Sequence, residues 1–326
     1  MNPTEENLQQ VTDRIKLIHD EISRVIVGHA DVIEGVLISL ISGGHVLLEG
    51  VPGLGKTTLL RTLGDVMHMG YSRIQFTPDL MPADIVGSVV LDTDMVGAKK
   101  LHFEPGPIFS NLVLADEINR ATPRTQSALL EAMQERTVTS GTTTYPLEEP
   151  FLVMATQNPL EMEGTYPLPE AQLDRFLMKI LVTYPNKSEL TKIVERTLSP
   201  EQPNIEHVAG REEILEIKSA ASNVLVAPHV QDFAIRLVLA TQPESEHGHQ
   251  IAKRYIRYGS SPRGAQALIK SGQVRALMRS RLNVSVEDIR TLSLPALRHR
   301  IILNFDAHAE GETPDNVLRD ILESLS

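Results

Sequence analysis

The sequence contains no cysteine and no tryptophan, and only 4% of its 326 residues are aromatic. Without cysteine the chain has no disulfide, no zinc ribbon and no catalytic thiol. Few aromatic rings also leave few platforms on which nucleic-acid bases could stack. Positive charge is in deficit too, because the formal net charge is −11 at pH 7. This composition argues against a general nucleic-acid binder.

Long apolar runs are also missing. No run approaches the ~20 residues needed to span a bilayer, and the polar, acidic residues 1–7 do not resemble a signal peptide. Hydrophobic residues make up 41% of the chain, enough for a substantial core, and the length fits one large or two ordinary domains. We therefore predict a soluble, cytoplasmic protein.

The central motif is at residues 50–57, Gly-Val-Pro-Gly-Leu-Gly-Lys-Thr, which fit the P-loop pattern G-x-x-x-x-G-K-[ST]. An apolar run at 45–49 predicts a buried strand before it, and residues 58–63 predict a helix after it. Glycines let the loop point its N–H groups at a phosphate, and the helix N-terminus adds positive charge. Lys56 would place its charge on the β- and γ-phosphates, and the Thr57 hydroxyl would bind Mg²⁺.

Two further strands end in polar residues. The run 111–117 ends in Asp116 and Glu117, and P-loop enzymes use such carboxylates to hold Mg²⁺. We predict that Asp116 binds the metal through its water shell and that Glu117 polarises the attacking water. The run 151–156 is followed by Asn158, near the expected γ-phosphate. A turn-forming Asn before Pro159 is the competing interpretation.

The remaining pattern divides the chain into two parts. Residues 73–77 and 178–182 predict two more strands, 88–91 and 100–103 predict hairpin arms, and 137–145 predicts a hairpin turning at Ser140-Gly141. Packing helices are expected at 8–27, 32–42 and 123–136. After Pro185 only helical stripes occur, at 188–198, 211–225, 229–241, 263–280 and 286–302. We expect a parallel α/β sheet followed by a mostly helical domain.

Residues 247–286 contain no Asp or Glu but hold eight basic residues: Lys253, Arg254, Arg257, Arg263, Lys270, Arg275, Arg279 and Arg281. They indicate either solvated helix faces, a surface that meets nucleotide phosphates and a neighbouring acidic subunit, or a local nucleic-acid patch. Pro262 predicts a helix start, which places Arg263 in the first turn. A cation is unfavourable there, so a nearby anion is expected.

Together these motifs resemble the AAA+ ATPases, and within them the MoxR family, over nearly the whole chain. The most specific stretches are 44–50, 74–80, 115–121, 155–159 and 171–176. The resemblance implies an α/β fold: an AAA+ P-loop NTPase core with a parallel five-stranded sheet plus a C-terminal all-α lid domain. It implies the following boundaries: a core at 1–184, a helix-2 insert at about 83–110, a pre-sensor-1 hairpin at about 137–150, a hinge at 185–205 and a lid at 206–326.

The resemblance also implies the cofactors ATP and Mg²⁺ and a role for each site residue. Thr57 and Asp116 would bind the metal, and Glu117 and Lys56 would be catalytic. Asn158 matches sensor 1, and Arg175 matches the arginine finger that reaches a neighbouring subunit's nucleotide. Arg263 matches sensor 2, acting in either the same or the neighbouring subunit. The nucleotide would further contact Val27, Gly28, Val51, Pro52, Gly53, Leu54, Gly55 and Thr58.

By family analogy the working state is a homo-oligomeric ring, hexameric in related proteins. It would act as a chaperone-like remodeller that matures a client enzyme complex, often by inserting a metal cofactor and often with a von Willebrand A-domain protein. The alternative is a nucleic-acid-dependent motor or clamp-loader-like ATPase, which the basic block favours and the net charge opposes. A protein-threading unfoldase ranks last, because residues 78–110 lack an obvious aromatic–hydrophobic–glycine pore loop.

Overall fold

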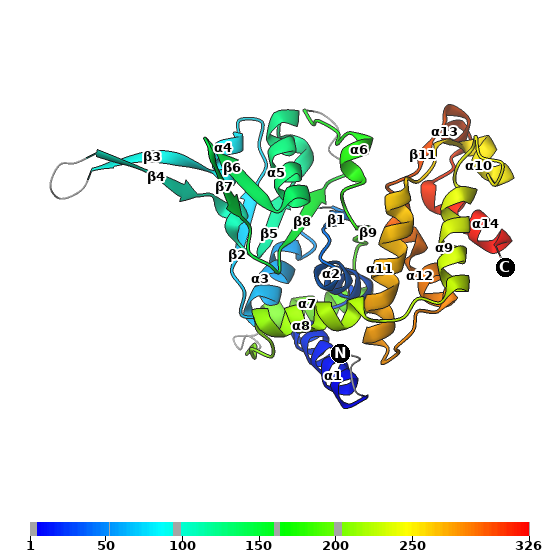
Figure 1. The fold of residues 1–326 in the computed structure, drawn as a ribbon, viewed down its shortest axis with the longest axis horizontal. Helices are drawn as coiled ribbons and strands as arrows, with labels where there is room; N and C mark the ends of the chain where they lie inside the picture. Colours follow the sequence, from blue (N-terminus) through cyan, green and yellow to red (C-terminus); the bar gives the residue numbers. More distant parts are fainter. Residues whose placement is uncertain (1–4, 52, 94–98, 160–163, 199–203, 326) are drawn as a thin grey trace.

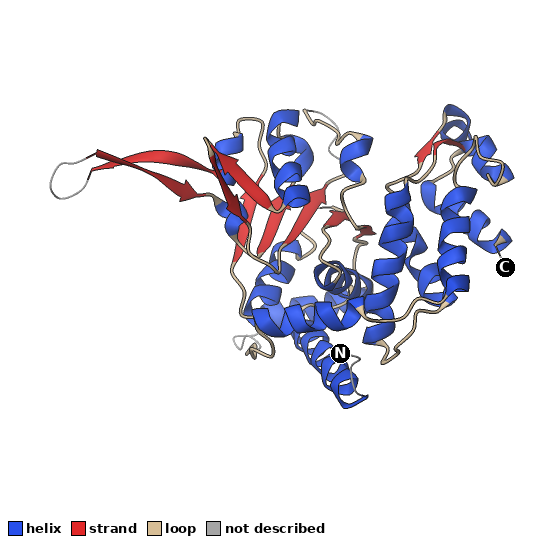
Figure 2. Cartoon of the chain, in the orientation of Figure 1, coloured by secondary structure: helices blue, strands red, loops and turns tan. Residues whose placement is uncertain are grey.

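The first half of the protein is built on one parallel sheet (Figures 1 and 2). A computed structural model describes residues 5–51, 53–93, 99–159, 164–198 and 204–325. The strands are β1 (Val46–Glu49), β2 (Tyr71–Gln75), β5 (Leu112–Asp116), β8 (Leu152–Gln157) and β9 (Met178–Leu181). Their order is β2-β5-β8-β1-β9, and every pairing is parallel. The predicted five-stranded parallel sheet is confirmed.

Helices cover both faces of this sheet. They are α1 (Glu5–Val25), α2 (Ala30–Ile41), α3 (Lys56–Val66), α4 (Pro82–Val86), α5 (Pro123–Glu135) and α6 (Glu170–Leu173), with short 3₁₀ turns η1 (Pro107–Phe109) and η2 (Ile118–Arg120). Leu48 of β1 belongs to the core that includes α1, α2 and α3. The adjacent Leu47 belongs to the core on the other face, with α4 and α5. Since successive strand residues point to opposite faces, a strand covered on both sides is apolar at nearly every position.

A long hairpin projects from the core (Figure 1). It consists of β3 (Gly87–Thr93) and β4 (Lys99–Pro105), which confirms and extends the predicted arms. The register pairs Val89 with Phe103 and Leu91 with Leu101, so these four side chains share one face. Near the root Phe103 stacks on Tyr145 with ring centroids 4.3 Å apart. Farther out, Leu91 and Leu101 are exposed.

The root of this hairpin is a tight crossing of backbones. Gly87 pairs with Pro105, and its φ of +96° lies in the region that favours glycine. A Cβ on Gly87 would lie 2.2 Å from the Glu104 carbonyl oxygen and 2.6 Å from the Gly106 nitrogen. The chain therefore enters and leaves the hairpin at nearly the same point.

The second hairpin consists of β6 (Thr137–Ser140) and β7 (Thr143–Pro146). Its turn is at residues 141–142, one residue later than predicted. Tyr145, on which Phe103 stacks, belongs to β7, so the two hairpins contact each other near the core.

The second half of the chain is mostly helical, as predicted, and its last helices group beside the β9 edge of the sheet (Figure 1). The helices are α7 (Lys187–Leu198), α8 (Arg211–Ser222), α9 (Pro228–Ala240), α10 (Gln250–Tyr255), α11 (Pro262–Met278), α12 (Val286–Leu297), α13 (Phe305–Glu310) and α14 (Pro314–Ser324). A short antiparallel pair joins β10 (Ile256–Tyr258) to β11 (Ile302–Leu303). Helix α8 packs on α1 and α2 of the predicted core as well as on α11 of the predicted lid. Its contacts therefore do not mark where the core ends, and the domain boundaries at 184 and 206 remain predictions.

One predicted helix is wrong at its end. Residues 286–302 were expected to be helical throughout, but α12 ends at Leu297. The following turn brings His299 and Arg300 against the segment before β9, where both side chains are buried and bonded to backbone carbonyls. These tertiary hydrogen bonds outweigh the local helical pattern.

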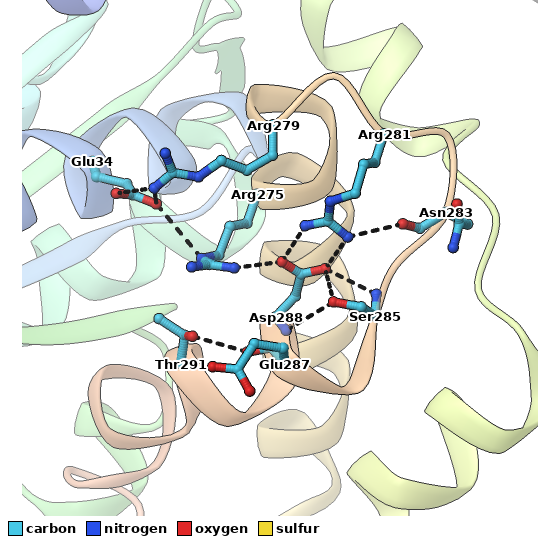
Figure 3. A network of polar contacts seen from close by, with 9 residues as sticks. All are labelled: Glu34, Arg275, Arg279, Arg281, Asn283, Ser285, Glu287, Asp288 and Thr291. Carbon is cyan, nitrogen blue, oxygen red and sulfur yellow. Dashed lines mark hydrogen bonds and ion pairs between the residues drawn. The ribbon is translucent and has the colours of Figure 1, made fainter.

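An ion-pair network joins the lid to the core (Figure 3). Asp288 of α12 is fully buried and accepts hydrogen bonds from Arg275 at 2.5 Å and Arg281 at 2.6 Å. On the core side, Glu34 of α2 lies 3.6 Å from Arg275 and 3.3 Å from Arg279. Burial raises the pKa of Asp288, but the hydrogen bonds outweigh burial and hold that pKa well below its usual range.

Candidate nucleotide-binding site

The loop between β1 and α3 has the geometry of an anion cradle. Gly53 and Gly55 have φ of +82° and +76°. Apart from the two chain neighbours of each glycine, no described residue has a heavy atom within 4 Å of a Cβ built there. The helix begins at Lys56, so the free N–H groups of its first turn lie at the loop. At the start of the loop, a Cβ on Gly50 would lie 2.6 Å from the Val182 carbonyl oxygen. Glycine at position 50 thus permits the close approach of the chain after β9.

Lys56 folds back into this loop. Its Nζ donates a 2.7 Å hydrogen bond to the Gly50 carbonyl oxygen. Burial lowers the pKa of Lys56, while the nearby carboxylates of Asp116, Glu117 and Glu49 act in the opposite direction. The ammonium group is therefore held between the loop backbone and the acids at the strand ends. One hydrogen bond must be exchanged for it to reach a phosphate.

Asp116 lies at the end of β5 and is held from both neighbouring strands. Its Oδ1 accepts a 2.7 Å hydrogen bond from the Thr156 hydroxyl of β8. Its Oδ2 accepts hydrogen bonds from Arg73 of β2, at 2.7 Å from Nη2 and 3.2 Å from Nε. The same Arg73 Nη2 donates to Gln75 Oε1 at 2.6 Å. Arg73, Gln75 and Thr156 are site residues that the sequence analysis missed.

Glu117 adopts a left-handed backbone conformation, with φ 57° and ψ 50°. Its N–H donates to the Thr156 hydroxyl oxygen at 2.8 Å. Its Oε2 accepts hydrogen bonds from Gln75 at 2.8 Å and from Arg120 at 2.9 Å. For a residue with a Cβ this conformation is unfavourable, and such strain persists where surrounding contacts hold it. The contacts fix the carboxylate at the mouth of the P-loop.

These residues surround one cavity of about 390 Å³. Every residue that lines it lies between positions 50 and 158. The buried Asn158 is among them, directly beyond β8. The lining residues are Gly50, Gly53, Leu54, Gly55, Lys56, Thr57, Thr58, Arg73, Gln75, Asp116, Glu117, Thr156, Gln157 and Asn158. The structure thus brings together most of the predicted nucleotide site.

The lining suits a nucleotide with magnesium. The Thr57 hydroxyl and the Asp116 carboxylate are hard oxygen donors of the kind that Mg²⁺ prefers. The loop N–H groups, the start of α3 and Lys56 provide positive potential for phosphates. The cavity volume falls in the range of about 300–1,000 Å³ that is usual for small-molecule sites.

Other predicted residues lie away from this cavity or outside the description. Val51 is in the loop but does not line the cavity, and Pro52 lies outside the described residues. Val27 and Gly28 connect α1 to α2, and Gly28 has φ +72°. The Glu189 side chain of α7 covers Gly28, 2.8 Å from where a Cβ would be. The contact of residues 27–28 with adenine stays a prediction.

Arg175 and Arg263 lie near the amino ends of the strands, opposite the ends at which the cavity lies. Since Met178 pairs with Val46 and Leu181 with Glu49, the segment before β9 is at the amino ends of the strands. The P-loop is at their carboxyl ends. Arg175 Nη1 donates to the Leu130 carbonyl oxygen at 2.8 Å. Neither arginine lines the cavity of its own chain.

Most of the basic block is paired within the chain. Five of its eight residues form ion pairs with carboxylates: Arg254 with Glu310, Arg263 with Asp174, Arg275 with Asp288 and Glu34, Arg279 with Glu34, and Arg281 with Asp288. The anion expected near Arg263 is Asp174, at 3.6 Å. The block lacks acids because its counter-charges come from other parts of the sequence.

The fold and the cavity define an AAA+ ATPase. A P-loop after β1, an acidic pair at the end of β5, an asparagine after the central strand β8 and a helical lid occur together on a parallel sheet. Residues 45–178 match the model of the "ATPase family associated with various cellular activities (AAA)", and residues 248–321 match the AAA lid domain.

Individual relatives specify the family. Chaperone MoxR1 of Mycobacterium tuberculosis is 42% identical over 94% of this chain and 80% of its own length. Protein MoxR of Methylorubrum extorquens is 30% identical over 100% of this chain and 98% of its own. A crystal structure of a protein from Cytophaga hutchinsonii superposes with a TM-score of 0.91 and 42% identity, covering 98% of this chain and 96% of that one. The chain belongs to the MoxR family of AAA+ ATPases.

Among the helices in the described part of the chain, none combines the length and apolarity of a membrane span. The resemblance to the MoxR family is confirmed, and so is the AAA+ fold with its helical lid.

Proposed function

We propose that the protein hydrolyses ATP to ADP and phosphate, with Mg²⁺ as the metal cofactor. The observation that carries this proposal is the single cavity shared by Lys56, Thr57, Asp116, Glu117 and Asn158. Mg²⁺, when bound, neutralises charge on the β- and γ-phosphate oxygens. We assign Thr57 and Asp116 to the metal and residues 51–58 to the phosphates, with Val27 and Gly28 near the adenine.

The chain's own groups would then act in separate ways. Lys56 would leave the Gly50 carbonyl and bind the β- and γ-phosphate oxygens. Glu117, held in place through Thr156 and Gln75, would orient the attacking water and accept its proton. Asn158 would donate its amide to the γ-phosphate. These roles together require positioning and electrostatics rather than a covalent intermediate.

We further propose that the active form is a closed ring of identical subunits, hexameric by family analogy. Arg175 and Arg263 lie near the amino ends of the strands, opposite the cavity at the carboxyl ends. A head-to-tail ring would bring this side of one subunit to the cavity of the next. Arg175 would be the arginine finger, and Arg263 would also act on the neighbour's nucleotide. An arginine finger contributes roughly 10³–10⁵ in rate where it has been measured, so an isolated subunit should be almost inactive.

The ring would use hydrolysis as a chaperone-like remodeller of a client enzyme complex, together with a von Willebrand A-domain partner. The relative named Chaperone MoxR1 supports this role. The exposed apolar face of the β3–β4 hairpin also offers a protein-binding surface. The nucleic-acid alternative is weakened, because five of the eight residues in the basic block already pair with carboxylates of the same chain.

Three separate substitutions test the ATPase assignment: Lys56→Ala, Glu117→Gln and Arg175→Ala. Each should reduce ATP turnover at least 10-fold, and Glu117→Gln should still bind ATP. Native turnover in all three would refute the assignment. The remodelling role is tested by a pull-down with the Glu117→Gln protein with and without ATP. Salt-sensitive stimulation of turnover by DNA would instead support the nucleic-acid alternative.

A further inference from the structure

The short segment between α6 and β9 is held by the lid. Arg300, whose side chain is only 3% exposed, donates hydrogen bonds to the carbonyl oxygens of Phe176 at 2.6 Å and Leu177 at 3.1 Å. His299 Nε2 donates to the same Phe176 oxygen at 3.0 Å. The lid therefore satisfies backbone acceptors in the segment that includes Arg175.

Asp174 supplies the negative charge that this arrangement needs. Its Oδ1 accepts a 2.9 Å hydrogen bond from Arg300 Nε. Burial lowers the pKa of Arg300 to about 10, and the Asp174 carboxylate opposes that effect. A buried guanidinium group without a carboxylate would be strongly destabilising. The bond from Arg300 to Oδ1 thus attaches the lid to the core.

The other carboxylate oxygen of Asp174 faces the start of α11. Oδ2 accepts a 2.9 Å hydrogen bond from the Ser261 hydroxyl, and Ser261 is the N-cap of that helix. Arg263 Nη1 lies 3.6 Å from the same oxygen, and its side chain is 49% exposed. An ion pair that is long and open to solvent is weak. Arg263 can therefore exchange Asp174 for a stronger anion, while Arg300 stays bound.

We propose that Asp174 is a positioning residue: it fixes Arg175 and Arg263 at one face of the subunit and couples the lid to ATP hydrolysis in the neighbouring subunit. The proposal rests on the ring ATPase proposed above. One oxygen anchors the lid through Arg300, and the other holds Arg263 until a neighbour's phosphate replaces it. Movement of the lid would then shift both arginines together, because Arg175 directly follows Asp174 in the chain.

The first test compares kinetics with binding. Asp174→Asn keeps the size of the side chain but removes its charge. We expect a fall in kcat of at least 10-fold, with the dissociation constant for a fluorescent ATP analogue within 2-fold of the native value. Asp315→Asn is the matched control. The Asp315 carboxylate pairs with an arginine of the lid, Arg298, at 2.9 Å, and its side chain is 17% exposed, as is that of Asp174. It should leave kcat within 2-fold. An equal loss of nucleotide binding in Asp174→Asn would overturn the proposal.

The second test asks whether the defect acts in the neighbour. Asp174→Asn protein, with an intact cavity, is mixed with Lys56→Ala protein, whose Asp174, Arg175 and Arg263 are intact. The two proteins are mixed in equal amounts and assemble at random into rings. Roughly a quarter of native turnover should return, because half of the subunits have an intact Lys56 and half of these have a neighbour with an intact Asp174. The proposal would be overturned if the mixture hydrolysed ATP no faster than the summed rates of the two inactive proteins measured separately.

Two controls separate the possible failures. If Lys56→Ala protein keeps native turnover, the ATPase assignment fails. If Arg175→Ala recovers turnover with Lys56→Ala protein but Asp174→Asn does not, the ring stands and the role of Asp174 is refuted. Should Asp174→Asn fail to form rings, Ser261→Ala removes one contact to Oδ2 and leaves Arg300 in place. Ser261→Ala should reduce kcat 2- to 5-fold, and turnover should recover when this variant is mixed with Lys56→Ala protein. A native kcat in Ser261→Ala would count against the proposal.

Discussion

The hydroxyl of Thr156 is the hydrogen-bond link between the two acids of the cavity, and its removal gives a sharp prediction. Thr156→Val preserves the shape of a residue that is only 1% exposed. It deletes the bond to Asp116 Oδ1 at 2.7 Å and the bond from the Glu117 N–H at 2.8 Å. Asp116 keeps its second partner, Arg73. Glu117 loses the hydrogen bond of its backbone N–H, one of the contacts that hold its left-handed conformation.

The size of the effect follows from these contacts. An unsatisfied buried N–H costs about 1–3 kcal/mol, and the left-handed conformation already costs a residue with a Cβ about 1–2 kcal/mol. The backbone at Glu117 should therefore relax and move the carboxylate away from the attacking water. A loss of about 1.5–3 kcal/mol in transition-state stabilisation corresponds to a decrease in kcat of roughly 10- to 100-fold. Nucleotide affinity should change little, because the loop at 50–57 is untouched.

The assay is steady-state phosphate release, with the dissociation constant of a fluorescent ATP analogue measured in parallel. Thr156→Ser keeps the hydroxyl and should retain kcat within about 3-fold, a small fraction of the effect of the valine. Thr62→Val, at a buried threonine of α3 with the same 1% exposure, controls for the loss of a hydroxyl elsewhere. Native kcat in Thr156→Val, or an equal loss in Thr156→Ser, would refute the reasoning.

Three further predictions concern pH, metal and the lid. Burial lowers the pKa of His45 from 6.5 to about 4. Between these pH values the unfolded chain therefore binds more protons at His45 than the folded chain does. The contribution of His45 to the free energy of unfolding is complete above pH 6.5 and falls by about 3 kcal/mol as the pH drops to 4. The fall in melting temperature between pH 7.5 and 5 should be smaller in His45→Gln than in the native protein, and equal falls would contradict this. Arg73→Ala removes a competitor for Asp116 and should lower the Mg²⁺ concentration for half-maximal nucleotide binding about 2- to 5-fold, whereas a rise would count against it. Asp288→Asn removes the charge of a fully buried carboxylate that pairs with Arg275 and Arg281. It should destabilise the lid by about 3–5 kcal/mol, seen as a lower melting temperature beside an unchanged Glu287→Gln control.

The fold was predictable where the signal is local. Buried parallel strands are short apolar runs, and the P-loop pattern fixes the strand and the helix on either side of it. The β10–β11 pair was missed, because β10 and β11 are too short to show an alternating pattern. The end of α12 was mispredicted, because tertiary hydrogen bonds of Arg300 decide it.

The site was predictable only in part for a similar reason. Lys56 and Asp116 occur in motifs that a single segment reveals. Arg73 and Thr156 contact Asp116 only because β2 and β8 flank β5 in the sheet. No single segment of the sequence predicts this strand order. The position of Arg175 near the amino ends of the strands likewise follows from the parallel direction of β9, not from the motif that contains Arg175.

The glycine crossing at the root of the β3–β4 hairpin has a consequence for modularity. Gly87 and Gly106 bring the incoming and outgoing chain together, with a Cβ on Gly87 only 2.6 Å from the Gly106 nitrogen. A hairpin that starts and ends at one point behaves as a cassette. Its arms can be lengthened, shortened or exchanged without changing the spacing of β2 and β5, so the exposed hairpin can diverge in length and sequence while the nucleotide site stays the same.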